Sequence, residues 1–250
     1  MKIDWSPLIT ELGLWRREGL PLPVWWRDDD AVAETPALSR LLRLSEELGV
    51  AVHVAVIPGR IEDSLLPAMT SGVPMVHGWT HISHSPQGVK NAEFGQPRKE
   101  AAGELVQAMA VMRAEFGEAL LPVFVPPWNR IDASIIAQLK AAGYAGLSTY
   151  GPRKAPLAAE GLAQINTHID PIFWKGHRGL AEPETLIAGI VQTLRDRRAG
   201  RTDATEPLGL LTHHLVHTED VWGFSAEVLR VLLDGGAEPA ALAAHLAPAP

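Results

Sequence analysis

Residues 24–31 read VWWRDDDA and join an apolar run directly to three consecutive acids. The apolar residues 24–26 predict a buried strand, and Asp28, Asp29 and Asp30 follow where that strand ends. In parallel α/β proteins the functional side chains gather at the ends of the strands. Adjacent carboxylates repel one another, so one of them takes up a proton or a cation neutralises them. The stretch therefore indicates a metal or general-base site, with a solvated turn and helix cap as the alternative.

Short apolar runs of this kind alternate with longer segments of helical period. This alternation predicts an α/β fold in which helices wrap a set of strands. The expected strands are residues 24–28, 50–57, 73–77, 122–125, 146–149, 164–169 and 208–213. The expected helices are residues 35–48, 99–116, 133–142, 184–198 and 225–233, with Thr35 suited to an N-cap. The Ala- and Pro-rich tail, residues 237–250, is compatible with one more short helix.

Composition narrows the function. The length of 250 residues is consistent with a single domain spanning residues 1–250. A formal net charge of -7 without a long Lys/Arg run argues against nucleic-acid binding. The sequence has no cysteine, so a metal must sit on His, Asp and Glu. The N-terminal residues do not resemble a secretory signal, and no segment approaches the ~20 apolar residues of a membrane span. We expect a cytoplasmic protein without a membrane span, and the oligomeric state stays open.

Two histidines end the third expected strand. In VHGWTH, residues 76–81, His77 and His81 stand four positions apart, and His84 follows three positions later. Two imidazoles and one carboxylate are a common set of zinc ligands that leaves positions open for water and substrate. The intervening Gly and Trp indicate a loop, unlike the helical HExxH motif. The alternative is a structural or solvent-facing pair.

A second pair of histidines ends the last expected strand. The apolar run LGLL, residues 208–211, leads into Thr212, His213 and His214. Neighbouring side chains alternate across a strand, so one histidine should point inward and the other outward. A histidine near a metal could protonate a leaving amine, and a hydrogen-bonded core histidine is the alternative.

Two further segments place aromatic residues at strand exits. VPPWN, residues 125–129, carries Trp128, whose flat face is of the kind that packs against sugar rings. DPIFW, residues 170–174, carries Trp174, which could line the same cleft. Packing of loops is the competing explanation for both.

Taken in order, these segments resemble the motifs of the polysaccharide deacetylase family, the family 4 carbohydrate esterases. RDDDA resembles the family's paired-Asp motif, in which the first Asp is the general base and the second binds the metal. HGWTH matches its H-x-x-x-H motif, and Leu211, Thr212 and His213 match its Leu-x-His motif, whose His is the general acid. The resemblance assigns Asp29 and His213 to catalysis. It assigns the metal to Asp30, His77 and His81. The substrate-binding or supporting residues are Arg27, Asp28, Pro127, Trp128, Asn129, Asp170, Trp174 and His214.

The sequence departs from the family at three places. The acid triplet also permits the register Asp28 with Asp29, and His213 competes with His214 for the role of acid. The Arg of the family's third motif is replaced by Val125 or Phe124, so a partner for Asp170 must come from elsewhere, with Arg27 and Arg130 as possible substitutes.

The resemblance implies a distorted, incomplete (β/α) barrel of about seven strands. It implies removal of an N-acetyl group from an amino sugar or a sugar-containing small molecule, with a divalent metal ion, zinc in the first instance, as cofactor. Two alternatives stay open: a related metal-dependent C-N hydrolase acting on a non-sugar amide, and a catalytically inactive carbohydrate-binding barrel.

Overall fold

A computed structural model describes residues 3–246 of the chain, and its strands form one sheet. The sheet runs in the order β6-β7-β5-β4-β3-β2-β1-β8, with β9 also paired to β1. All pairings are parallel except that of β6 with β7. The strands are β1 (Pro23–Ala31), β2 (Val52–Val56), β3 (Val73–His77), β4 (Val123–Val125), β5 (Gly146–Leu147), β6 (Leu157–Ala159), β7 (Leu162–Gln164), β8 (Leu208–Thr212) and β9 (Glu238–Pro239).

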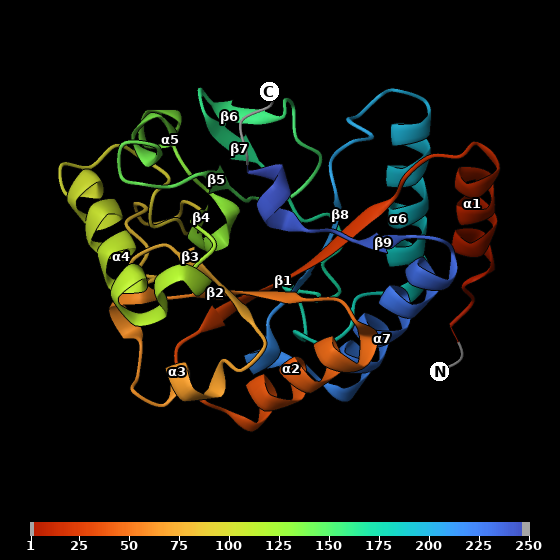
Figure 1. Cartoon of the computed structure of the whole chain (residues 1–250), viewed down its shortest axis with the longest axis horizontal. Helices are drawn as coiled ribbons and strands as arrows, with labels where there is room; N and C mark the ends of the chain where they lie inside the picture. The colour runs from red at the N-terminus through yellow and green to blue at the C-terminus, as the bar shows by residue number, and fades with distance from the viewer. Residues whose placement is uncertain (1–2, 247–250) are drawn as a thin grey trace.

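Helices surround this sheet on most sides (Figure 1). Figure 1 shows α4 and α5 on the left, α2 and α3 below, and α1, α6 and α7 on the right. Their bounds are α1 (Ser6–Arg17), α2 (Pro36–Leu48), α3 (Leu65–Ala68), α4 (Ala101–Phe116), α5 (Ala133–Leu139), α6 (Pro183–Arg198) and α7 (Glu219–Asp234). Thr35 caps α2 as predicted, because its side chain accepts a hydrogen bond from the backbone N–H of Leu38.

The α/β fold with strands wrapped by helices is confirmed, and the seven expected strands correspond to β1–β5, β7 and β8. The sequence did not predict β6, β9, α1 or α3, which are short or lack a clear apolar pattern, and α7 begins six residues before the expected position 225. The strand expected at 164–169 overlaps β7 (Leu162–Gln164) only at Gln164, because β7 begins two residues earlier. The remainder continues as isolated bridges at Thr167 and Ile169.

The barrel is incomplete, as expected. Within residues 3–246, the end strands β6 and β8 do not pair with each other. The gap is narrowed by a parallel bridge between Ile169 and Leu210 of β8. The backbone N–H of Leu211 donates to the carbonyl of Ile169 at 2.7 Å. The sheet therefore curls round without closing through a continuous ladder.

Side chains of β1 alternate between the two faces of this curled sheet. Trp26 packs in the large outer cluster between the sheet and the helices. Trp25 packs in a smaller inner cluster with Met75, Val123 and Leu242. Leu242 belongs to a 3-10 turn, Leu242–His245, in the tail for which a short helix was expected, and residues 247–250 of that tail lie outside the described residues. The tail thus contributes to the core of the curled sheet.

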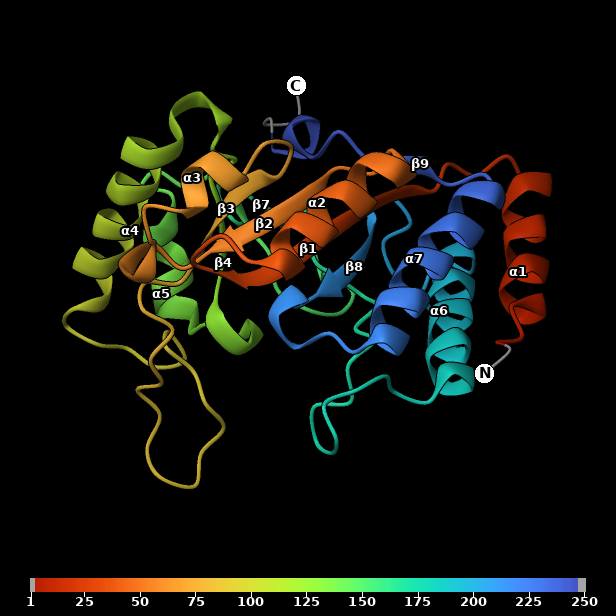
Figure 2. The ribbon, with the colours of Figure 1, turned by 90° about the horizontal axis from the view of Figure 1, so that it is seen from below.

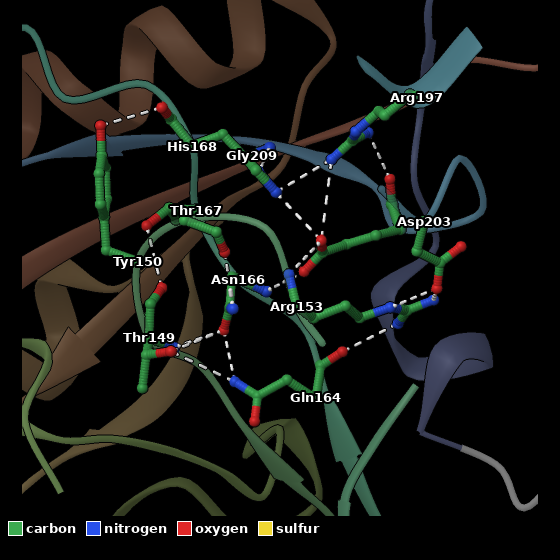
Figure 3. A network of polar contacts seen from close by, with 12 residues as sticks. Thr149, Tyr150, Arg153, Gln164, Asn166, Thr167, His168, Arg197, Asp203 and Gly209 are labelled. Carbon is green, nitrogen blue, oxygen red and sulfur yellow. Dashed lines mark hydrogen bonds and ion pairs between the residues drawn. The ribbon is translucent and has the colours of Figure 1, made fainter. Parts of the chain in front are cut away.

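A buried polar network holds the open side of the sheet together (Figure 3). The backbone N–H of Gly209 donates to Nδ1 of His168, whose Nε2 lies 3.1 Å from the carboxylate of Glu206. The same carboxylate accepts from the backbone N–H groups of Arg153 and Asn166. Because its members are nearly all paired, the network can be buried without a large desolvation cost.

No helix among the described residues is long and apolar enough to cross a membrane. The cytoplasmic location stays a prediction.

Candidate active site

Two of the three acids at the end of β1, Asp29 and Asp30, reach the same cavity, and Asp28 points away from it. Arg27 and Asp29 face the interior of the curled sheet, on the same side as Trp25, because residues two apart share a face. Asp28 faces the opposite side, toward β8, where it pairs in register with Thr212. Asp30 would face the same way as Asp28, but its φ of 79° and a register shift between Asp28 and Ala31 break the alternation. This irregular backbone brings Asp30 to the site.

Asp30 lies against both histidines of the HGWTH segment. Its Oδ1 is 3.1 Å from Nε2 of His77 and 3.2 Å from Nε2 of His81. Potential ligand atoms of the three residues lie within 4.8 Å of one another. Burial raises the pKa of the Asp30 carboxyl, but the hydrogen bond and charge of His77 outweigh burial and hold that pKa well below its ordinary value. The three side chains could share one divalent cation.

The surroundings of His77 suit a metal ligand. Nδ1 of His77 is 3.0 Å from the backbone carbonyl of Val125. A carbonyl oxygen only accepts, so Nδ1 carries a proton, and a bound cation would take the place of the proton that Nε2 shares with Asp30. Metal-binding histidines in proteins commonly use such a second contact to fix the ring and its tautomer. The donor set of one carboxylate and two imidazoles therefore fits a divalent cation.

A buried glutamate holds the loop that carries these histidines. The carboxylate of Glu93 accepts hydrogen bonds from the backbone N–H groups of Trp79 (3.1 Å) and Thr80 (2.7 Å) and from the Thr80 hydroxyl (3.0 Å). Gly78 has a φ of 59°, and a Cβ there would lie 2.2 Å from Glu93 and 2.6 Å from Pro127. Glu93 and a glycine at position 78 are therefore both needed for the shape of the loop between His77 and His81.

Asp29 forms an ion pair with Arg27, which lies on the same face of β1. Nε of Arg27 is 2.9 Å from Oδ1 of Asp29, and Nη2 donates to Oδ2 at 3.1 Å. Nη2 also donates to Oδ1 of Asn129 at 2.7 Å, and Nη1 donates to the hydroxyl of Ser148 at 2.8 Å. The guanidinium is fully buried. Arg27 thus fixes the Asp29 carboxylate from the side away from solvent.

The two histidines that follow β8 separate as the alternation predicts. His213 lines the site, with Nε2 3.9 Å from Oδ2 of Asp29 and its ring 4.7 Å from that of Trp174. His214 is buried, and its Nδ1 lies 2.5 Å from Oδ1 of Asp28. Asp28 also accepts from the Thr212 hydroxyl at 2.6 Å. The geometry therefore favours His213 over His214 as the residue that reaches a substrate.

Asp170 and Trp174 interact with each other at the mouth of the site. The indole N–H of Trp174 donates to Oδ2 of Asp170 at 2.8 Å, and the backbone N–H of Ile172 donates to Oδ1 at 3.0 Å. Burial raises the pKa of the Asp170 carboxyl, and His213 only partly offsets this. Neither arginine proposed as a partner reaches Asp170: Arg27 holds Asp29, and Arg130 donates to the carbonyl of Asn91. The expected substitution was wrong, because both guanidinium groups bond to other residues and Asp170 pairs with the Trp174 indole instead.

These side chains line one cavity of about 430 Å³. Its lining contains the expected residues Asp29, Asp30, His77, His81, Trp128, Asn129, Asp170, Trp174 and His213. Of the other expected residues, Arg27, Asp28, Pro127 and His214 are buried and support this cavity from behind. Sequence reasoning assigned no site role to the lining residues Tyr150 and Arg178, which lie in loops without a recognisable pattern, nor to Glu93.

Backbone strain is concentrated in the same place. Five non-glycine residues between positions 3 and 246 have positive φ, and all five line this cavity: Asp30, His81, Trp128, Asn129 and Arg178. Such conformations cost about 1 kcal/mol or more each and persist where the surroundings impose them, often at functional sites. Figure 2 shows that the long loop between β3 and α4 and the loop preceding α6, which carries Trp174 and Arg178, extend from the same side of the molecule.

Solved structures of family 4 carbohydrate esterases share this fold. The esterase from Streptomyces lividans in complex with acetate is 12% identical, with a TM-score of 0.56 over 87% of this chain and 91% of that chain. An acetyl xylan esterase from Clostridium thermocellum in complex with a cobalt ion is 14% identical, with a TM-score of 0.53 over 89% of each chain. A mutant family 4 pseudoenzyme with restored enzymatic activity is 15% identical, with a TM-score of 0.57 over 91% of this chain and 68% of that chain.

No protein-family model and no curated protein matches the sequence. At identities of 12% to 16% the structural similarity establishes the fold. The chain has the polysaccharide deacetylase fold of the family 4 carbohydrate esterases, and the resemblance seen in the motifs is confirmed at that level.

Proposed function

We propose that the protein is a metal-dependent hydrolase that removes an N-acetyl group from an amino sugar or a sugar-containing small molecule. One observation carries the proposal: Asp29 and His213, 3.9 Å apart, face the same cavity as the cluster of Asp30, His77 and His81. Hydrolysis of an amide needs a base for water and an acid for the amine, and Asp29 and His213 could supply both beside the candidate cation cluster. Proteins with this fold include a peptidoglycan N-acetylglucosamine deacetylase, which supports the substrate class.

Asp30, His77 and His81 would hold the cation, and we propose zinc because one carboxylate and two imidazoles are a donor set that zinc accepts. When bound, such a cation lowers the pKa of water toward ~7 and polarises the amide carbonyl. Nδ1 of His77 keeps its proton for the carbonyl of Val125, so Nε2 is free to act as the ligand.

Asp29 would take one proton from the attacking water. Arg27 holds both carboxylate oxygens, which keeps Asp29 oriented toward the cavity without itself touching the substrate. The water oxygen forms a bond to the carbonyl carbon and the C–N bond breaks. His213 would donate the proton from Nε2 to the departing nitrogen, giving acetate and a free amine. Trp128 and Trp174 line the cavity and offer apolar faces for a sugar ring.

The proposal is tested by acetate release from N-acetylglucosamine and its oligomers, with zinc content measured on the same samples. Asp29→Asn should retain zinc and lose at least 100-fold in kcat, since general-base catalysis contributes about 10²–10⁴. Asp63→Asn, an exposed aspartate outside the cavity, is the matched control and should behave like the wild type.

Wild-type turnover in Asp29→Asn would overturn the assignment of the base. If the zinc-loaded wild-type protein releases acetate from none of the amino sugars, the proposed sugar deacetylase activity is overturned. Release of amine from a non-sugar amide would then support the related C-N hydrolase.

A further inference from the structure

A second cavity adjoins the metal-ligand cavity. It has a volume of about 630 Å³ and shares Asn129 and Arg130 with the first. Its other walls come from the loop between β3 and α4, including Lys90 and Gln96, and from Thr149 and Gln164 beside β5 and β7. A substrate with its acetamide at the His77 cluster can therefore extend past Asn129 into this second space.

The charge of this second cavity differs from that of the whole molecule. The protein carries a formal net charge of -7, yet the lining of the second cavity contains two cationic side chains, Lys90 and Arg130, and no acidic one. Glu93, which follows the lining residue Ala92 in the sequence, directs its carboxylate to the backbone of Trp79 and Thr80. An anion entering the cavity would thus meet cations and no carboxylate in its walls.

Three residues of the lining, Lys90, Asn129 and Arg130, offer hydrogen-bond donors. Arg130 uses Nη1 on the carbonyl of Asn91 and has no carboxylate partner within residues 3–246, which leaves its other N–H groups available. Lys90 likewise forms no ion pair within residues 3–246. Asn129 accepts from Arg27 through Oδ1, so its amide NH₂ group is left as a donor. Unpaired arginine and lysine side chains beside a donor amide are the usual recognition groups for phosphate and carboxylate oxygens.

Arg178 adds a third cation, in the lining of the metal-ligand cavity. It has a φ of 55° and no ion pair among the described residues. The two cavities are therefore lined by three cations that form no ion pair within residues 3–246.

We infer that the second cavity is a subsite for an anionic group on the substrate, a phosphate ester or diester, held by Arg130 and Lys90. This inference rests on the proposed deacetylase function and narrows its substrate to phosphorylated N-acetyl amino sugars. A free sugar phosphate, a nucleotide-linked sugar and a lipid-linked sugar diphosphate all present this chemistry. Their common feature is the phosphate oxygen near Arg130.

The test compares kcat/KM of the zinc-loaded protein for N-acetylglucosamine, N-acetylglucosamine 1-phosphate, N-acetylglucosamine 6-phosphate, UDP-N-acetylglucosamine and a polyprenyl diphosphate N-acetylglucosamine in detergent. At least one phosphorylated compound should exceed the neutral sugar by tenfold or more, and the preferred compound identifies the source. Arg130→Gln and Lys90→Gln should each reduce that preference at least threefold, mainly through KM. Lys99→Gln removes the same charge outside both cavities and should leave the preference unchanged.

Equal kcat/KM for the neutral and phosphorylated sugars would overturn the proposed anion subsite but not the proposed deacetylase function. A preference that survives in both variants would also overturn it. Lys90 is exposed, so Lys90→Gln keeps the fold even if Arg130→Gln does not.

If no sugar releases acetate, the proposed function fails and inorganic pyrophosphate is titrated into the zinc-loaded wild type and Lys90→Gln instead. Binding that weakens at least threefold in Lys90→Gln supports the anion subsite, and equal or absent binding overturns it.

Discussion

Nδ1 of His214 lies 2.5 Å from Oδ1 of Asp28, and both side chains are buried beneath the site. The Asp28 carboxylate also accepts from the backbone N–H of His214 at 3.0 Å and from the Thr212 hydroxyl. Asp28 therefore joins the end of β1 to the turn that follows β8. That turn carries His213, so the first acid of the triplet shapes the site without facing it.

Replacing Asp28 should affect stability more than metal binding. Asp28→Asn leaves His214 without its buried charge partner, and breaking such a pair costs about 3 kcal/mol of the free energy of unfolding. Urea unfolding measures this loss, and zinc content should stay near that of the wild type. An Asp28→Asn protein of normal stability that has lost its zinc would favour the alternative register of the acid pair.

Arg27 should act as a positioning residue for the base. Arg27→Lys keeps a positive charge but loses the planar fork that contacts both oxygens of Asp29, so we expect kcat to fall at least tenfold. KM and zinc content should change little, because the contact is to the base and not to the metal ligands. A variant with unchanged kcat would show that Asp29 needs no such support.

Substitutions should distinguish the proposed metal ligands from a nearby histidine on the same loop. His81→Ala removes one of the three proposed ligands and should abolish near-stoichiometric zinc binding, as should His77→Ala. His84→Ala is the matched control, because His84 lies on the same loop, three residues beyond His81, and is not part of the cluster. Zinc content after dialysis measures the effect. Equal zinc in all three variants would exclude this cluster as the metal site.

His213 and His214 should give opposite phenotypes. His213→Gln is expected to lower kcat at least 100-fold with little change in stability, because the side chain lines the cavity. His214→Gln should mainly lower stability through the loss of its contact with Asp28. Parallel measurements of acetate release and urea unfolding distinguish the two, and the reverse result would make His214 the acid.

His53 should make stability fall at acidic pH. Burial lowers its pKa to about 4 in the folded protein, against 6.5 for an ordinary histidine. The unfolded chain takes up the proton below pH 6.5 while the folded chain does not, so stability falls as the pH drops from 6.5 to 4. The loss from this group is about 3 kcal/mol. His53→Asn should flatten the difference in unfolding free energy between pH 7 and pH 4, and an unchanged difference would contradict the assignment.

The sequence by itself determined the class of fold and the approximate place of the site. Apolar runs that end in Asp30, His77 and His213 predicted strands, and parallel strands bring their carboxyl ends to one edge whatever the details of packing. Local patterns were sufficient here because the hydrophobic period of each segment is a property of the chain itself.

Only the tertiary structure decided which of the neighbouring acids and histidines face the cavity. Asp28, Asp29 and Asp30 are chemically identical in the sequence. A positive φ at Asp30, which no local pattern predicts, brings Asp30 to the cavity that Asp29 lines, while Asp28 faces away. The partner of Arg27, the role of Glu93 and the cations of the second cavity likewise depend on contacts between segments far apart in the chain. Such contacts are decided by the packing of the whole sheet, because side-chain direction follows from register and backbone twist, which the residue types alone do not specify.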